Sequence, residues 1–198
     1  MTRLTLLLPI LLLALLVGNP AFAADFLKGY AAYKSGDYAT ALREFRPLAE
    51  QRNAGAQNNL GVMYEKGQGV YQNDKTALKW YRLAAEQGDA GAQYNLGWMY
   101  RRGRGVPQNY KTAVKWYRFA AEQGVADAQT SLGVMYGKGR GVPQDYVRAH
   151  MWYNLAASQG DKDATENRDI VAKKMSPVDI SKAQDLARDC VQKNYKGC

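Results

Sequence analysis

The glycine-rich stretch YGKGRGVPQDY at residues 136–146 contains three glycines interleaved with Lys138 and Arg140. Glycines of this kind let backbone N–H groups approach a phosphate, and basic side chains supply the matching charge. A phosphate loop, however, normally occurs once in a chain, after a strand and before a helix. Similar stretches occur here at 64–74 and 100–110, and each of the three follows a segment with helical periodicity. We therefore interpret the loops as turns between helices and do not expect them to bind a nucleotide.

Few other residues could carry out catalysis. His150 is the single histidine, and together with only Cys190 and Cys198 it cannot form the usual nitrogen and sulfur zinc site. No serine is followed three residues later by lysine, so the Ser-x-x-Lys acylation motif is absent. His150 also aligns with Leu78 and Val114, which lie 72 and 36 positions earlier, and we expect it to be a packed structural side chain. The sequence therefore predicts no enzyme activity, no metal ion and no cofactor.

The N-terminal segment is typical of an exported protein. Arg3 precedes an apolar run over residues 4–17, and Ala21-Phe22-Ala23 forms an A-x-A cleavage site. The alternative is an uncleaved membrane anchor, but about fourteen residues at ~1.5 Å rise span only ~21 Å of a hydrocarbon core about 30 Å thick. We therefore predict a signal peptide over 1–23, cleavage after Ala23, no stable membrane span after cleavage, and a periplasmic or secreted location.

Export also bears on the two cysteines. In an oxidising compartment Cys190 and Cys198 most simply form a disulfide with each other. That bond would close a small loop and add about 2.5 kcal/mol of stability in the chain-entropy model. Two free thiols are the alternative, so the sequence alone leaves both states open.

The net charge restricts the kind of partner. It falls from +9 to +8 when Arg3 is removed with the signal peptide. A basic excess favours acidic partners, such as anionic envelope polymers, acidic proteins or nucleic acid. Motifs that read RNA or DNA are missing, and an exported chain meets little nucleic acid. We therefore expect no nucleic-acid partner, and we retain a protein or an anionic envelope polymer.

The chain repeats itself every 36 residues, and such a period indicates stacked helical units. Leu-Gly pairs recur at 60–61, 96–97 and 132–133, and Trp-Tyr pairs recur at 80–81, 116–117 and 152–153. The units expected from this register are 53–88, 89–124 and 125–160. One unit cannot bury its own apolar face, so neighbouring units must stack.

Each unit is expected to be a pair of helices. Apolar residues recur at helical spacing in both halves of the first unit, at Ala56, Leu60, Met63 and Tyr64 and then at Ala77, Trp80, Tyr81 and Ala84. The loop glycines are suited to ending the first helix in a left-handed conformation, and Asn73, Asn109 and Asp145 to capping the second. Because glycine inside a helix costs about 1 kcal/mol, Gly61, Gly97 and Gly133 indicate that the second helix passes close to the first.

These repeats resemble a known family. The unit A-x-A-Q-x-x-LG-x-MY-x-x-G-x-GV-x-Q, followed by A-x-x-WY-x-x-AAEQG, is similar to the Sel-1-like repeat, a branch of the tetratricopeptide superfamily. GYAAYKSGDYATALREF at 29–45 resembles a plain tetratricopeptide hairpin, so 24–52 is expected to form the first helix pair. The resemblance implies an all-α, right-handed superhelical solenoid of antiparallel helix pairs. It also implies a scaffold or adaptor that binds other proteins on its concave face.

The end of the chain is expected to cap this solenoid. Residues 161–198 have helical composition, and Ser176-Pro177-Val178-Asp179 is typical of a helix start, for a helix through about Lys193. Similar repeat proteins often finish with a paired-helix terminator, so 161–198 is interpreted as C-terminal capping helices. The third unit lacks the basic stripe of the first two, which indicates that the terminal helices or a partner cover this surface.

Positions that the repeat does not require are candidates for binding a partner. They lie on the first helix of each unit, which the family geometry would place on the concave side: Asn58, Val62, Glu65, Tyr94, Trp98, Arg101, Thr130, Val134 and Gly137. Trp98, flanked by Tyr94 and Arg101, has the composition of an interface hot spot. The alternative is that Trp98 packs on a neighbouring helix. As an interface residue, Trp98→Ala would change the free energy of unfolding by less than ~1 kcal/mol.

A second candidate is a basic surface on the second helices, formed by Lys75, Lys79, Arg82, Lys111, Lys115 and Arg118. Its two interpretations are a solvated helix face and an attraction to an anionic surface. The sequence therefore predicts an exported, non-catalytic scaffold that binds a protein, for example as an envelope or periplasmic regulator. The alternatives are a secreted factor that binds a host protein, glycan or envelope polymer, and, less favoured, a β-lactam-binding or β-lactamase-like protein.

Overall fold

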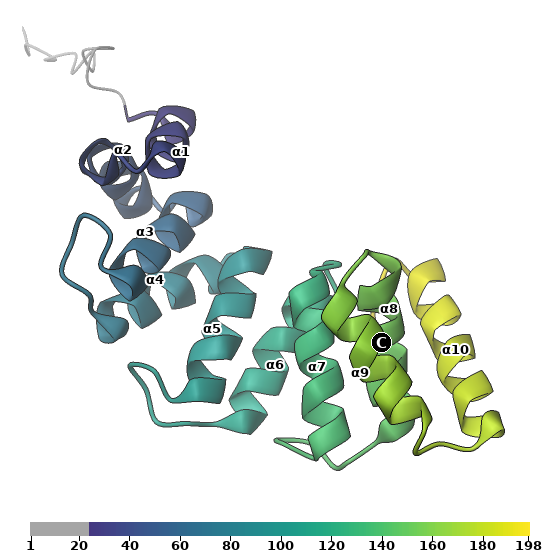
Figure 1. The fold of residues 1–198 in the computed structure, drawn as a ribbon. Coiled ribbons are helices and arrows are strands. Elements are labelled where there is room, and N and C mark those ends of the chain that lie inside the picture. Colours follow the sequence, from purple (N-terminus) through teal and green to yellow (C-terminus); the bar gives the residue numbers. More distant parts are fainter. Residues whose placement is uncertain (1–23) are drawn as a thin grey trace, which may run out of the picture.

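The computed structural model describes residues 24–198, and the expected signal peptide over 1–23 lies outside this part of the chain. Residues 24–198 form ten α-helices and no strand (Figure 1). The helices are α1 (Phe26–Ser35), α2 (Tyr38–Glu50), α3 (Ala54–Lys66), α4 (Asp74–Glu86), α5 (Ala90–Arg102), α6 (Tyr110–Ala121), α7 (Ala126–Lys138), α8 (Tyr146–Ser158), α9 (Lys162–Ala172) and α10 (Pro177–Gln192). None of them has the length and apolar character that crossing a bilayer requires.

The helices stack in chain order. Each odd-numbered helix from α1 to α7 pairs with the helix that follows it, and the second helix of each pair packs on the first helix of the next pair. First helices also contact each other, α3 with α5 and α7 with α9, whereas the second helices of neighbouring pairs lie farther apart. The first helices are therefore crowded toward the inner side of the curved stack seen in Figure 1. We call their exposed faces the first-helix surface.

The helix ends form as the sequence predicts. Gly67, Gly103 and Gly139 follow the first helices in the left-handed conformation, with φ of 68°, 70° and 61°. The side chains of the predicted caps Asn73, Asn109 and Asp145 accept hydrogen bonds from backbone N–H groups in the first turn of the second helices. The glycine loops are thus helix ends, as expected.

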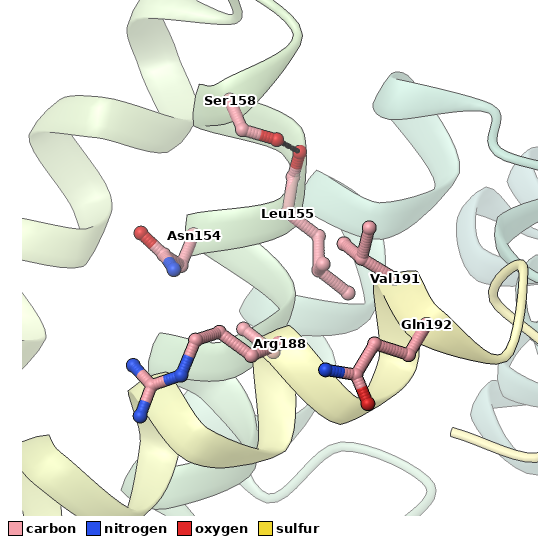
Figure 2. A pocket seen from close by; sticks show the side chains of 7 residues that line it. Asn154, Leu155, Ser158, Arg188, Val191 and Gln192 are labelled. Carbon is pink, nitrogen blue, oxygen red and sulfur yellow. Dashed lines mark hydrogen bonds between the residues drawn. The ribbon is translucent and has the colours of Figure 1, made fainter.

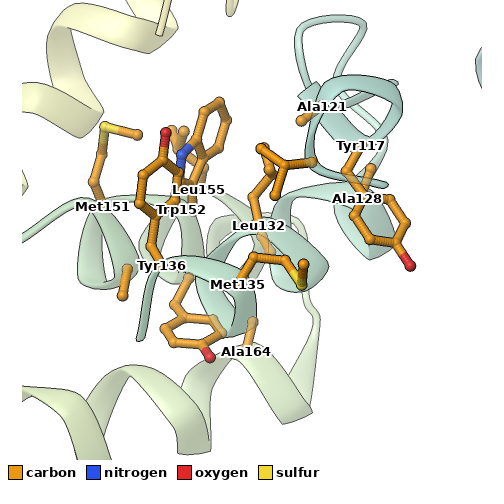
Figure 3. Packing of buried hydrophobic residues seen from close by; sticks show 14 of the residues in the cluster. Tyr117, Ala121, Ala128, Leu132, Met135, Tyr136, Met151, Trp152, Leu155 and Ala164 are labelled. Atoms are coloured by element: carbon orange, nitrogen blue, oxygen red, sulfur yellow. The ribbon is translucent and has the colours of Figure 1, made fainter. Parts of the chain in front are cut away.

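The core repeats with the sequence. The first helices bury alanine, leucine and methionine at equivalent positions, and the second helices bury alanine and tyrosine. Figure 3 shows the cluster of the third unit, in which Leu132 and Met135 of α7 lie between Tyr117 of α6 and Trp152 of α8. The buried residues among 24–198 form three clusters along the stack, and the half-buried Trp98 and Tyr100 pack against two of them, so neighbouring units are connected through their apolar side chains.

Each glycine inside a first helix leaves space for an aromatic ring from the second helix of the same unit. A Cβ atom at Gly61, Gly97 or Gly133 would lie 2.5, 2.7 or 2.5 Å from the ring of the tyrosine that packs on it from the second helix. These tyrosines are Tyr81, Tyr117 and Tyr153. The sequence led us to expect the backbone of the second helix to be the close neighbour. The tyrosine ring takes this place instead, because it lies flat across the gap that glycine leaves.

Three buried glutamines connect successive helices. The side-chain amide of Gln57 donates to the carbonyl oxygen of Ala49 at 2.9 Å, and its side-chain carbonyl accepts from the amide of Gln87 at 2.6 Å. Gln93 and Gln129 make the equivalent bonds in the next two units. Each glutamine therefore joins the end of one second helix to the end of the next.

The glycine loops also contact the preceding pair of helices. The contacts join equivalent positions in successive units: Gln68 with the hydroxyl of Tyr38 at 2.8 Å, Arg104 with the carboxylate of Asp74 at 2.6 Å, and Arg140 with the ring of Tyr110 at 5.5 Å from its centre. Each contact lies at the N-terminal end of a second helix. The chemistry changes from unit to unit, but the place of the contact does not.

The C-terminal cap departs from the hairpin pattern. α9 packs on α8 as the first helix of a further pair would, but α10 also packs on α8 and makes few contacts with α9. The paired-helix terminator expected from the resemblance is therefore not a hairpin. A disulfide joins Cys190, which is buried in the core, to Cys198, so the pairing of the two cysteines is confirmed. Within the loop that it closes, the ring of Tyr195 lies against Gly124 in the turn between α6 and α7.

Candidate partner-binding surface

A pocket opens between the first helices of the first two repeat units. It has a volume of about 240 Å³, and α3 and α5 provide most of its lining. The lining residues are Val62, Glu65 and Lys66 of α3, Tyr81 of α4, and Tyr94, Asn95 and Trp98 of α5. Four of these were expected at a partner-binding surface from the sequence, namely Val62, Glu65, Tyr94 and Trp98. The structure therefore brings residues from two separate units to one hollow on the first-helix surface.

Trp98 lines this pocket and packs against the protein at the same time. Its side chain is half-buried. It packs against two clusters of buried residues, one in α4 and α5 and the other in α6 to α10. The guanidinium group of Arg104 lies 5.8 Å from the centre of its ring. Trp98 is thus a packing residue and also lines the pocket, so neither interpretation excludes the other.

The buried tyrosines of the second helices extend their hydroxyl groups to one position on the first helix of the same unit. The residue at this position differs from unit to unit. In the first unit the hydroxyl of Tyr81 donates to Glu65 at 2.6 Å, and burial, followed by Glu65, raises the pKa of Tyr81 above its usual range. In the second unit the side chain of Arg101 donates from Nε to the hydroxyl of Tyr117 at 3.1 Å. Opposite charges therefore occupy the same position in neighbouring units.

The third unit leaves this position without a side chain. Gly137 stands where the first two units have Glu65 and Arg101, and the hydroxyl of Tyr153 makes no hydrogen bond with any group in residues 24–198. Burial alone raises the pKa of Tyr153 to about 12. The first-helix surface therefore carries no side chain at Gly137.

The remaining predicted residues lie on the same first helices but outside the pocket. Asn58 accepts a hydrogen bond from Asn95 at 3.1 Å, which links α3 to α5. Thr130 donates to the carboxylate of Asp161 at 2.6 Å, which links α7 to the start of α9. Val134 is half-buried against the core of the third unit. Asn58 and Thr130 thus also connect neighbouring first helices.

The basic stripe on the second helices is partly used for packing. Arg82 donates to the hydroxyl of Tyr100 at 2.9 Å, and Arg118 donates to that of Tyr136 at 2.8 Å, so both arginines connect neighbouring units. Lys79 and Lys115 lie over the rings of the tryptophans next to them, each at 5.8 Å. Lys75 and Lys111 are exposed. The stripe therefore combines structural arginines with solvated lysines.

His150 is buried in α8, at the position of Leu78 and Val114. Burial, with a further effect of Arg168, lowers the pKa of its imidazole, whereas Asp169 acts in the opposite direction. Its Nδ1 atom has no hydrogen-bond partner among residues 24–198. Within the same residues, no group of three or more His, Cys, Asp or Glu side chains is arranged to hold a metal ion.

A second hollow lies at the other end of the molecule. It has a volume of about 320 Å³ and is formed where α10 crosses α8 (Figure 2). Its labelled lining residues are Asn154, Leu155 and Ser158 of α8 and Arg188, Val191 and Gln192 of α10. Ser158 donates to the carbonyl oxygen of Leu155 at 2.7 Å within its own helix. Leu155, Ala187 and Val191 supply apolar side chains to its lining, and we interpret it as a gap in the packing of the cap.

Sequence reasoning missed the polar residues that join the units. The buried glutamines and the loop residues Gln68, Arg104 and Arg140 were not singled out, although Gln57, Gln93 and Gln129 recur every 36 residues. This recurrence was the available indication, because a polar residue kept in a repeated apolar face requires a partner. The hydrogen bond between Arg101 and the hydroxyl of Tyr117 joins the two helices of one unit. No repeated pattern in the sequence indicates this bond.

Comparisons with known proteins agree with this architecture. The family model described as Sel1 repeat matches residues 54–89, 90–125 and 126–161, each one residue later than the unit expected from the sequence. The structure is similar to the crystal structure of a Sel1 repeat protein from Oxalobacter formigenes, with 35% sequence identity and a TM-score of 0.67, over 86% of this chain and 78% of that one. A search among curated proteins gives no significant match.

A further similar structure is a protective antigen present in uropathogenic Escherichia coli strains, which displays an SLR fold. Its sequence identity to this chain is 30% and the TM-score is 0.61. The similarity covers 86% of this chain but 46% of the antigen, so the chain spans about half the length of that protein.

Proposed function

Because the chain belongs to the Sel1 repeat family, we propose that it is a non-catalytic scaffold that binds a protein partner on its concave first-helix surface. Sel1 repeat proteins are typically scaffolds for protein interactions. The observation that carries the proposal for this chain is the pocket between α3 and α5. Apart from Tyr81, which is a tyrosine in every unit, its lining residues lie at positions that differ between units, whereas the packing positions around it stay the same.

We further propose that the protein acts after export. The basic, apolar and A-x-A segments at the N-terminus support this location, and the disulfide between Cys190 and Cys198 is compatible with an oxidising compartment. Fractionation of the native source tests this part of the proposal. Mature protein that begins at Ala24 is expected in the periplasm, and full-length protein in the cytoplasm would contradict export.

Partner capture by matched tryptophan variants tests the scaffold function. Trp98 and Trp116 are both half-buried, but Trp116 lies on the second helix α6 and does not line the pocket. Both alanine substitutions are expected to lower the free energy of unfolding by about 1–3 kcal/mol, because each removes part of a packed ring. For Trp98→Ala, this loss of stability is larger than the change of less than ~1 kcal/mol that the sequence suggested for an interface residue.

The capture experiment uses the immobilised mature chain and an envelope extract, with mass spectrometry of the retained proteins. A partner retained by the wild type and by Trp116→Ala, but lost with Trp98→Ala, supports the proposal. Equal loss with both variants would assign the effect to stability and contradict a partner-binding role for the pocket.

A second candidate function is a factor released from the cell that engages a host. The similarity to a protective antigen of uropathogenic Escherichia coli favours this alternative. Release of the mature protein into the medium would support it, whereas retention in the periplasm supports an envelope scaffold. A β-lactam hydrolysis assay on the mature chain tests the remaining enzymatic alternative, and measurable turnover would contradict the non-catalytic proposal.

A further inference from the structure

Basic side chains gather at the C-terminal ends of the first helices. We call them the first-helix cations, and they are Lys34 of α1, Lys66 of α3, Arg101 and Arg102 of α5, and Lys138 of α7. All but Arg101 are exposed. Within residues 24–198, none of the five forms an ion pair with a carboxylate within 4.0 Å. Their charge is therefore available to a partner.

Nearby carboxylates do not neutralise this charge. Glu65 lies among the cations and keeps its negative charge, since its carboxylate accepts only the neutral hydroxyl of Tyr81, so it offsets one of the five positive charges. Asp74 is already paired with Arg104 at 2.6 Å. Asp127 is exposed at the opposite end of α7 from Lys138. The net charge at the C-terminal ends of the first helices is therefore positive.

Arg101 is the member of the set with a fixed position. Its side chain is half-buried, and its Nε atom donates to the buried Tyr117 at 3.1 Å. The ring of Tyr117 packs against that of Tyr94, which lines the pocket, with 5.8 Å between the ring centres. Its two terminal nitrogen atoms have no acceptor among residues 24–198. A planar guanidinium group held in this way presents two parallel donors, the arrangement that binds a carboxylate most strongly.

The neighbouring unit leaves room for that carboxylate. Gly137 occupies the position equivalent to Arg101 on α7, and a Cβ atom there would meet only the side chain of Ala149, at 3.7 Å. The first unit shows how a carboxylate fits such a position, since Glu65 accepts the hydroxyl of Tyr81. The position on α7 that corresponds to Arg101 is therefore open to an acidic side chain from outside.

The aromatic surroundings indicate a protein segment rather than a uniform polyanion. Tyr94 and Trp98 lie on the same helix as Arg101, and the pocket that they line accepts a side chain as well as a charge. A polymer that carries only charge would not use this pocket. Basic residues interleaved with aromatic rings on a curved surface instead suit an extended peptide with acidic and large apolar residues.

We propose that the first-helix surface binds an extended acidic segment of a protein partner, with one carboxylate held by Arg101 and an adjacent side chain in the pocket between α3 and α5. This inference rests on the proposed scaffold function and specifies the chemistry of the partner. The carboxylate comes from an aspartate or glutamate side chain or from the C-terminus of the partner.

A random peptide library displayed on phage, selected on the immobilised mature chain, provides the test. Enriched sequences are expected to contain aspartate or glutamate next to a large apolar residue. Synthetic fluorescent versions of these peptides, with a free or an amidated C-terminus, then give the dissociation constants and show which type of carboxylate is bound.

Charge variants on both sides of the pocket identify the contact. Arg101→Gln is expected to weaken peptide binding about tenfold or more, and Glu65→Gln to leave it unchanged or to strengthen it. The exposed pair Lys66→Gln with Lys138→Gln, which no packing contact requires, is expected to weaken binding about three- to tenfold. The equally charged pair Lys182→Gln with Lys193→Gln in the cap serves as the matched control and is expected to have no effect.

The possible outcomes separate this inference from the scaffold function. Enriched peptides without acidic residues that still require Trp98 would overturn the acidic partner and leave the scaffold function standing. Equal weakening by the cap pair and by the first-helix pair would show a nonspecific polyanion surface and also overturn it. An absence of enriched peptides contradicts the inference, while the capture experiment with Trp98→Ala decides separately on the scaffold function.

Discussion

Two glycines of α7 show how single residues set the packing of a unit. Both lie in the same helix, but a Cβ atom at Gly133 would come within 2.5 Å of the ring of Tyr153, whereas one at Gly137 would meet only Ala149, at 3.7 Å. Gly133 is therefore required by packing. Gly137 is not, and its position on the first-helix surface is open.

Alanine substitution at these two glycines is expected to change stability in opposite directions. Gly133→Ala should lower the free energy of unfolding by about 1–3 kcal/mol, because the clash with Tyr153 outweighs the gain in helix propensity. Gly137→Ala should raise it by about 0.5–1 kcal/mol. Urea unfolding followed by circular dichroism measures both, and a stabilised Gly133→Ala variant would contradict the packing described here.

His150 is expected to make stability depend on pH. Its pKa is lowered in the folded protein from the usual 6.5, so around and below this pH the unfolded chain binds more protons than the folded one. The free energy of unfolding therefore decreases as the pH is lowered through this range. His150→Leu, which restores the residue found at Leu78, should remove this dependence between about pH 7.5 and 5.5. Carboxylates with lowered pKa, such as Glu44, titrate below this window. An unchanged pH dependence in His150→Leu would assign the effect to other groups.

The sequence predicts residue roles well where one helix decides them. The caps Asn73, Asn109, Asp145 and Ser176 follow from local chemistry, because each accepts a hydrogen bond from the backbone N–H group three residues later. The side chain that fills the gap at Gly61 could not be assigned from its own helix, because the ring belongs to Tyr81. Trp98 likewise has two environments, and only the folded stack shows how its surface is divided between them.

At the scale of elements, polar contacts fix how one helix pair meets the next. Gln93 is buried, donates to the carbonyl oxygen of Ala85 at 3.2 Å and accepts from Gln123 at 2.7 Å. Gln93 and Ala85 are both buried, so water cannot replace the bond between them, although the carbonyl oxygen of Ala85 also accepts the N–H group of Gly88 at 3.0 Å. The exposed amide of Gln123 can bond to solvent instead.

Substitutions at the two ends of this contact are expected to differ in cost. Gln93→Leu should lower the free energy of unfolding by about 1–2 kcal/mol, since it removes the buried hydrogen bond to Ala85 and leaves that carbonyl oxygen with the N–H group of Gly88 as its donor. Gln123→Ala should lower it by less than ~1 kcal/mol. Thermal unfolding of both variants checks the difference, and equal costs would mean that the buried amide does not connect the units.

Element boundaries could be predicted because the loops carry their own chemistry, whereas contacts between elements could not. Glycine in the left-handed conformation and an Asn or Asp cap are local features that recur every 36 residues. The loop contacts at Gln68, Arg104 and Arg140 involve residues about thirty positions away, and their chemistry differs in every unit. The position of α10 on α8 depends in the same way on the whole end of the stack.

At the scale of the molecule, the repeat determines the fold and leaves the first-helix surface free to vary. Leucine, methionine, alanine and tyrosine at equivalent positions build the core, and the C-terminal helices with their disulfide close its end. The all-α solenoid could therefore be predicted from the 36-residue period. The identity of a partner could not, because the residues that would contact it are those that stacking does not constrain.

Hydrogen exchange of the mature chain, free and with a captured partner, tests the central claim most directly. If the first-helix surface binds the partner, amides of α3, α5 and α7 should become more protected, while those on the outer faces of α4 and α6 should not change. Protection confined to the second helices, or to the hollow between α8 and α10, would contradict a scaffold that works through its inner face.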